Sequence, residues 1–372
     1  MNAMKSTLVL VALLVLGQVP LVLADDSAKQ TPPPFYPDKV KLLMWRDEQG
    51  AEHAVTNTRD WQRRREHILA NMELVMGPLP AADRRVPLDV QVVQTEELPT
   101  LTRKKITYAA TKDYRVPAYL LIPKSEIRNR KFPAMLCLHG TSGSRGRTAG
   151  LGADYPRYTL ELAERGYVTI APDYTLLGEN QTDPTAAGFA SGTMMGIWSH
   201  SRAVDLLQSL PEVDPERIGC VGVSLGGHNS LFAGVFDPRL KVMVSSSGFD
   251  SFNDYKGGDL SGWCQPRYMM RIQDVFGKDP KKMPFDFPEV LAALAPRHLY
   301  VHAPLDDSNF RVESARRCVE AASAVYRLLG AADRIVAVYP PGKHGYPIEA
   351  REASYQFMDR VLKKQPTPGP ER

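Results

Sequence analysis

The sequence Gly-Val-Ser-Leu-Gly-Gly-His occupies positions 222–228. It follows the apolar, β-prone run at 217–221 and precedes residues 229–235, which are compatible with a helix. We therefore expect Ser224 on a strand-to-helix turn, the nucleophile elbow, where a strained backbone lifts the hydroxyl above the carboxyl edge of a sheet. The glycines on either side lack Cβ atoms, so strand and helix can pack closely around that turn. The first N–H groups of the helix are free to stabilise an oxyanion nearby.

Strand and helix patterns alternate along the chain on both sides of this turn. Three short β-rich runs come first, at 90–93, 105–111 and 116–122, and they predict antiparallel leading strands. The alternation that follows predicts an α/β fold with a mostly parallel twisted sheet and helices on both faces. The later strands are expected at 132–138, 167–171, 217–221, 240–244, 298–303 and 334–339, and helices at 158–165, 314–329 and 348–362.

The alternation breaks between residues 248 and 296, after the strand expected at 240–244. This insertion is irregular and rich in aromatic residues, among them Trp263 and Tyr268. An insertion at the catalytic edge of a sheet is well placed to form a lid or a pocket wall. A packed excursion without substrate contact is the alternative.

The residues before the sheet predict an exported protein. Residues 1–24 have the features of a signal peptide: Lys5, an apolar run at 8–16 and a small-residue end before Asp25. This predicts a periplasmic or extracellular location, with no membrane anchor after cleavage. Residues 25–87 are expected to form a leader and an amphipathic helix at 60–76, whose arginine run at 63–65 is predicted to be solvated. The main domain is then 88–364, followed by a loose tail at 365–372.

The composition excludes several other classes of protein. Apolar residues make up 43% and charged residues 24% of the 372 positions, which is typical of a soluble globular protein. The formal charge of +4 falls to +3 without Lys5 (4 − 1 = 3), and basic and aromatic residues do not cluster, so nucleic acid is not an expected partner. No metal-ligand spacing and no phosphate-binding glycine loop is found, so neither a metal nor a cofactor is predicted. The sequence does not indicate an oligomeric state.

The four cysteines divide into two pairs. Cys137 and Cys220 lie in expected core strands, where a small buried thiol is the simplest interpretation. Cys264 and Cys318 could form a disulfide in an exported protein, but their spacing does not require one.

An alcohol is a weak nucleophile near neutral pH, so Ser224 needs a base, and that base needs a carboxylate to orient it. His344 follows the last expected strand and precedes the last helix, where a loop can carry an imidazole over the serine. Asp306 and Asp307 follow the strand at 298–303, and Asp250 follows the strand before it. Each of the three aspartates is a candidate for the acid.

The oxyanion of the reaction also needs hydrogen-bond donors that are already in place. The backbone N–H of Leu225 is one by its position after the nucleophile. The turn after the strand at 132–138 is expected to supply the other, from Gly140 or Thr141.

These motifs resemble the α/β-hydrolase superfamily over residues 88–362. Within it, the segments 61–80, 303–310 and 342–346 are similar to exported bacterial proteins grouped with acetyl xylan esterases and dienelactone hydrolase-like enzymes. The resemblance implies Asp307 as the acid, because the aspartate two positions before the Asn-Phe pair takes that role in the family. It implies a carboxylesterase that removes small acyl groups, acetyl above all, from carbohydrate through an acyl-enzyme.

The chain also departs from these families. Leu225 stands where acetyl xylan esterases have glutamine and glucuronoyl esterases have arginine, and Ser224 stands where dienelactone hydrolases have cysteine. A peptidase or amidase of the prolyl oligopeptidase-like type is an alternative, although the residues before 88 are too few for a propeller domain. A hydrolase-like binding protein without catalysis is the other alternative.

Overall fold

The computed structural model describes residues 32–126, 129–152 and 154–363, and all structural statements refer to them. The expected signal peptide (1–24), the leader up to residue 31 and the tail (365–372) lie outside the described residues.

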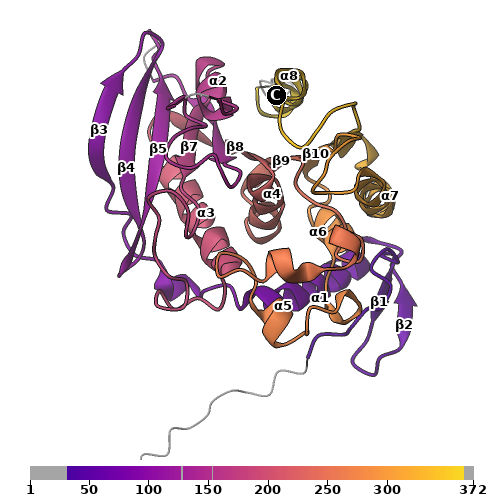
Figure 1. Cartoon of the computed structure of the whole chain (residues 1–372). Helices are drawn as coiled ribbons and strands as arrows, with labels where there is room; N and C mark the ends of the chain where they lie inside the picture. Colours follow the sequence, from indigo (N-terminus) through magenta and orange to yellow (C-terminus); the bar gives the residue numbers. More distant parts are fainter. Residues whose placement is uncertain (1–31, 127–128, 153, 364–372) are drawn as a thin grey trace, which may run out of the picture. The chain divides into compact units, whose positions relative to one another are not determined.

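A nine-stranded sheet carries the site, in the order β11-β10-β9-β8-β6-β7-β5-β4-β3 (Figure 1). The strands from β11 to β7 are parallel, whereas β5, β4 and β3 join them antiparallel. The predicted α/β class, with a mostly parallel sheet and antiparallel leading strands, is confirmed. The strands are β3 (Gln91–Glu97), β4 (Leu101–Thr111), β5 (Tyr114–Pro123), β6 (Phe132–Leu138), β7 (Val168–Pro172), β8 (Val213–Val223), β9 (Leu240–Ser246), β10 (His298–His302) and β11 (Ile335–Val338).

Helices cover both faces of the sheet, so its central strands are buried on both sides. Successive side chains of β6 enter opposite clusters: Leu136 joins the one with α3 and α4, and Cys137 joins the one with α2 and α8. The helices are α1 (Thr58–Met76), α2 (Tyr158–Glu164), α3 (Gly192–Ser209), α4 (Leu225–Phe236), α5 (Arg271–Asp274), α6 (Phe287–Ala293), α7 (Val312–Leu328) and α8 (Ile348–Leu362). No helix among the described residues is long and apolar enough to cross a bilayer.

The segment before the sheet is more ordered than its sequence suggests. A short hairpin of β1 (Met44–Arg46) and β2 (Glu52–Ala54), which we did not predict, precedes α1. The prediction that the arginine run is solvated is wrong for Arg64, which is fully buried and pairs with Glu289 of α6. Arg64 lies three residues after Trp61 and four before Ile68, so helical periodicity places it on the buried face of α1.

The insertion at 248–296 is not irregular throughout. It contains α6 and a cluster of aromatic rings in mutual contact, those of Phe252, Trp263 and Phe287. Asp286 and Glu289 form a capping box at the start of α6, and the Asp286 carboxylate also accepts hydrogen bonds from Ser251 and from the Phe252 N–H. The remaining short elements are 3₁₀ helices at Ala82–Arg84, Tyr255–Gly257, Leu260–Trp263, Pro280–Lys282 and Ala332–Arg334.

The cysteines carry no disulfide. Cys264 and Cys318, which could have paired, are free thiols, as are Cys137 and Cys220.

The buried ion pair between α1 and α6 yields a stability prediction. Glu289→Ala leaves the Arg64 guanidinium buried without its carboxylate, which costs about 3–5 kcal/mol in the free energy of unfolding. Urea denaturation measures this loss. The double variant Arg64→Met/Glu289→Leu is expected to recover most of it, because no charge is then left unpaired. Equal stability of the single and double variants would contradict this account.

Candidate active site

Ser224 occupies a strained turn between β8 and α4. Its φ of 56° and ψ of −120° lie outside the regions that residues with a Cβ prefer, at a cost of about 1–3 kcal/mol. The surrounding packing holds it there. A Cβ on Gly222 would lie 2.2 Å from the Gly226 carbonyl oxygen, and one on Gly226 would lie 1.9 Å from the Leu138 carbonyl oxygen. Glycine is therefore required at both positions.

Three side chains that are far apart in the sequence form one hydrogen-bonded chain. The distance from His344 Nε2 to Ser224 Oγ is 2.9 Å, and His344 Nδ1 lies 2.9 Å from each carboxylate oxygen of Asp307. His344 lies on the loop between β11 and α8, and Asp307 follows β10. An ionised carboxylate only accepts hydrogen bonds, so Nδ1 carries the proton. Nε2 is then free to accept the proton of the serine hydroxyl.

The surroundings of Asp307 keep it ionised. Burial alone raises the pKa of this carboxyl, but the hydrogen bond from His344 and those from the N–H groups of Asn309 and Phe310 outweigh burial and hold the pKa below its usual value.

The structure separates the three candidate aspartates. Asp306 has an exposed side chain, and its backbone N–H donates to the Gly342 carbonyl at 2.9 Å, which ties together the two loops that carry Asp307 and His344. Asp250 is buried, and its Oδ2 accepts the Arg311 N–H at 3.0 Å. The imidazole of His344 is bonded to Asp307.

The expected oxyanion donors lie on either side of the nucleophile. Leu225 is the first residue of α4, where N–H groups have no partner within the helix. The Gly140 N–H donates to the Tyr155 hydroxyl at 2.9 Å and is therefore occupied. Thr141 is the other residue expected to donate from that turn.

Two serines that the sequence reasoning missed hold the histidine loop. Ser246 Oγ donates to the Gly345 carbonyl at 2.9 Å, and the Gly345 N–H donates to Ser247 Oγ at 3.2 Å. Their position at the end of β9 was the only available signal. These bonds fix the loop one residue after His344.

The insertion packs directly on the elbow. His228, one helical turn after Ser224, contacts Trp263, with ring centroids 4.8 Å apart. The Tyr268 ring lies beside both, with its centroid 6.0 Å from that of His228 and 6.0 Å from that of Trp263. Segment 248–296 thus packs against α4, the helix that begins directly after Ser224.

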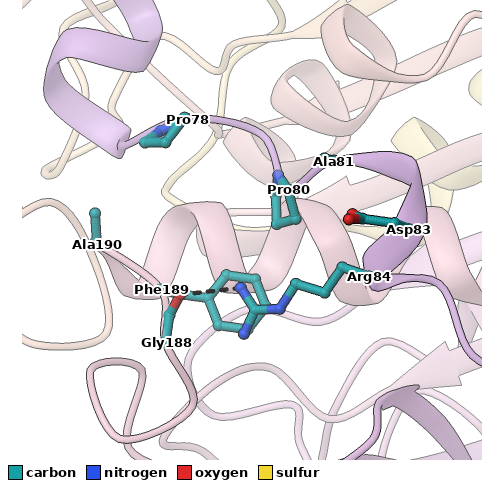
Figure 2. A pocket seen from close by; sticks show the side chains of 8 residues that line it. All are labelled: Pro78, Pro80, Ala81, Asp83, Arg84, Gly188, Phe189 and Ala190. Atoms are coloured by element: carbon teal, nitrogen blue, oxygen red, sulfur yellow. Dashed lines mark hydrogen bonds between the residues drawn. The ribbon is translucent and has the colours of Figure 1, made fainter. Parts of the chain in front are cut away.

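Two cavities differ in their relation to this site. One of about 600 Å³ is lined by His344 and by residues of the loop that carries it. Another, of about 470 Å³, lies between the segment after α1 and the loop before α3 (Figure 2). There the Arg84 guanidinium covers the Phe189 ring at 4.3 Å and donates to the Gly188 carbonyl at 2.9 Å. Within the described residues, no group of three or more His, Cys, Asp or Glu side chains is arranged to hold a metal ion.

A serine at a strained strand-to-helix turn, the order Ser, Asp, His along the chain, and the mixed sheet define an α/β-hydrolase.

Comparisons with known proteins agree with this class. The family model "Glucuronyl esterase, fungi" matches residues 174–330. YtaP of Bacillus subtilis (strain 168) is 25% identical over 307 residues, covering 77% of this chain and 96% of YtaP. The 4-O-methyl-glucuronoyl methylesterase 1 of Wolfiporia cocos (strain MD-104) is 28% identical over 225 residues, covering 54% of this chain and 51% of that protein.

Solved structures show the same fold. A glucuronoyl esterase from Solibacter usitatus superimposes with a TM-score of 0.64 at 21% identity, covering 88% of this chain and 98% of that chain. A Bacteroides fragilis NCTC 9343 protein that carries the name acetyl xylan esterase gives a TM-score of 0.58 at 18% identity, with 76% of both chains covered. The chain thus has the α/β-hydrolase fold and resembles proteins named as esterases.

Asp250 yields a pH prediction. Burial, reinforced by nearby carboxylates and opposed by the Arg311 N–H, raises the pKa of this carboxyl from 3.8 to about 7. Between these values the folded state binds a proton that the unfolded state has lost, so stability falls as the pH rises, by up to about 4 kcal/mol in total. Asp250→Asn mimics the protonated acid and removes this loss. Urea midpoints at pH 4 and pH 8 measure the effect, with the exposed Asp333→Asn as control; parallel pH dependence of wild type and Asp250→Asn refutes it.

Proposed function

We propose that the protein is an exported serine esterase that removes small acyl groups, acetyl above all, from carbohydrate. The observation that carries the proposal is the hydrogen-bonded chain from Ser224 through His344 to Asp307. Relatives named glucuronoyl methylesterase and acetyl xylan esterase support an ester of a carbohydrate as the substrate.

The mechanism follows from the geometry. His344 Nε2 takes the hydroxyl proton while Ser224 Oγ attacks the ester carbonyl, and the Leu225 and Thr141 N–H groups stabilise the oxyanion. The alcohol leaves with the proton that His344 returns. A water molecule, deprotonated by His344, then hydrolyses the acyl-enzyme. Asp307 orients the imidazole and stabilises its charged form.

The residues beside the nucleophile favour a small acyl group. Leu225, His228 and Trp263 are 2%, 5% and 3% exposed, and the rings of His228 and Trp263 are in contact, so little open space is left on this side. Leu225 is apolar, so it offers no charged group to the acyl part of a substrate.

A second candidate is hydrolysis of a glucuronoyl methyl ester. The family match over residues 174–330 and the methylesterase relatives favour it. The two candidates differ in which side of the ester bond carries the sugar: the alcohol side in an acetylated sugar, the acyl side in a glucuronoyl ester.

Ser224→Ala tests the proposed nucleophile. Without the hydroxyl no acyl-enzyme forms, so kcat for an aryl acetate is expected to fall at least about 10⁴-fold. The assay pairs wild type and variant on aryl acetate and on aminoacyl amide, with mass spectrometry after an organophosphonate. A phosphonyl adduct on Ser224 in wild type alone supports catalysis. Amide turnover without ester turnover would favour a peptidase, and no adduct and no turnover would favour a binding protein.

The aspartates provide a paired test. Asp307→Asn lets His344 carry its proton on Nε2 instead of Nδ1, and Nε2 can then no longer accept the proton of Ser224. The kcat for the aryl acetate is therefore expected to fall roughly 10⁴-fold. Asp306→Asn changes only an exposed side chain, whereas the contact with the Gly342 carbonyl is made by the backbone N–H of residue 306. The kcat should therefore remain within about twofold of wild type. Steady-state kinetics on both variants decides, and a larger loss from Asp306→Asn would reverse the assignment.

A further inference from the structure

His302 is a buried imidazole that the mechanism described so far does not use. It is the last residue of β10, is 1% exposed, and lies opposite Ser246, the last residue of β9, in the parallel ladder. Burial lowers the pKa of His302 to about 4, although the charge of Asp307 opposes this shift. The ring is therefore neutral near pH 7 and carries one proton on its nitrogens.

The hydrogen bonds of Ser246 decide which ring nitrogen carries that proton. Ser246 Oγ lies 2.8 Å from His302 Nδ1 and 2.9 Å from the Gly345 carbonyl oxygen. A carbonyl oxygen only accepts hydrogen bonds, so the Ser246 hydroxyl donates to Gly345 and its oxygen accepts from the Nδ1–H of His302. His302 thereby fixes the direction of the Ser246 hydroxyl.

Ser246 joins the nucleophile turn to the loop that carries His344. Its carbonyl oxygen accepts the Ser224 N–H at 2.9 Å, and its hydroxyl donates to the Gly345 carbonyl. Gly345 directly follows His344, whose Nε2 lies 2.9 Å from Ser224 Oγ. One residue is thus bonded to both of the segments between which the proton moves.

His302 also supports the next residue, Ser247, in an unfavourable conformation. The φ of Ser247 is 44°, in the region that favours glycine, and such a conformation costs about 1–3 kcal/mol. The Ser247 N–H donates to the His302 carbonyl at 2.8 Å, and the Ser247 Oγ accepts the Gly345 N–H at 3.2 Å. The side chain and the backbone of His302 therefore each hold one of the two serines that bind Gly345.

The histidine at this position destabilises the fold in one respect. Its Nε2 has no hydrogen-bond partner among the described residues, and an unsatisfied buried polar atom costs about 1–3 kcal/mol. A leucine would bury no such atom, but it could not donate to Ser246. A buried polar atom without a partner calls for an explanation, and the bond from Nδ1–H to Ser246 provides one.

We propose that His302 is a positioning residue for the triad: by directing the Ser246 hydroxyl to the Gly345 carbonyl, it holds His344 at hydrogen-bond distance from Ser224. The inference rests on the proposed function, since it concerns the same triad, and it adds a residue that does not touch the reacting atoms. Without the Nδ1–H donor the Ser246 hydroxyl is no longer oriented. A displacement of about 1 Å between reacting groups can lower a rate roughly 100-fold, so the loss is expected in kcat rather than in KM.

Two variants of the same shape test the inference. Asparagine places an N–H donor close to the position of the histidine Nδ1–H, whereas leucine has the same branching and no donor. We expect kcat for the aryl acetate to fall at least about tenfold in His302→Leu and no more than about threefold in His302→Asn, with KM within about twofold of wild type in both. Equal kcat values in the two variants would overturn the inference.

A double-mutant cycle separates positioning from a general effect on the fold. In Ser246→Ala the hydroxyl that His302 orients is absent, so adding His302→Leu should lower kcat by no more than about twofold further. A further loss as large as the one that His302→Leu causes in the wild-type background contradicts the proposal. Urea midpoints of the four proteins show that each is folded under the assay conditions.

The rate at which a fluorophosphonate modifies Ser224 keeps this test separate from the proposed function. That reaction needs His344 to accept the serine proton but needs no ester substrate. Modification at least about tenfold slower in His302→Leu than in His302→Asn supports the inference, and it does so even where wild type fails to hydrolyse aryl acetate and the proposed function falls. Equal modification rates in the two variants overturn the inference and leave the esterase assignment standing.

Discussion

The site depends on one backbone constraint, the positive φ of Ser224. That conformation is unfavourable for a residue with a side chain. It persists because the end of β8 and the start of α4 pack so closely that positions 222 and 226 have room only for glycine. The Leu138 carbonyl, at the end of β6, occupies the space that a side chain at 226 would need. The strand that leads into the oxyanion turn therefore also holds the nucleophile in place.

Asp307 and His344, the other two groups of the proposed triad, are placed by loops that are bonded to one another rather than by regular structure alone. Asp306 ties its loop to Gly342, and Ser246 and Ser247 tie Gly345 to the end of β9. His344 lies between these attachments. The imidazole is consequently held on both sides in sequence before any substrate arrives, which reduces the entropy lost in reaching the reactive geometry.

The surroundings of Ser224 differ between the side of the insertion and the side of His344. The match to the family model of glucuronyl esterases covers residues 174–330, and on the side of the insertion this chain has the apolar Leu225 and the packed pair of His228 and Trp263. On the other side, a cavity of about 600 Å³ is lined by His344 and by residues of its loop. The loops around the sheet edge, and not the sheet, determine what fits, so a shared fold does not by itself define the substrate.

The sequence by itself determined the sheet class, the elbow at Ser224 and the order of serine, aspartates and histidine. These follow from local periodicity and from glycine spacing, which neighbouring residues largely define. Tertiary structure alone decided which of Asp250, Asp306 and Asp307 meets His344, although the family resemblance had favoured Asp307. It also decided that the Gly140 N–H is occupied and that Arg64 is buried. Each of these outcomes depends on contacts between distant segments, and adjacent residues in a loop point in directions that only the packed chain defines.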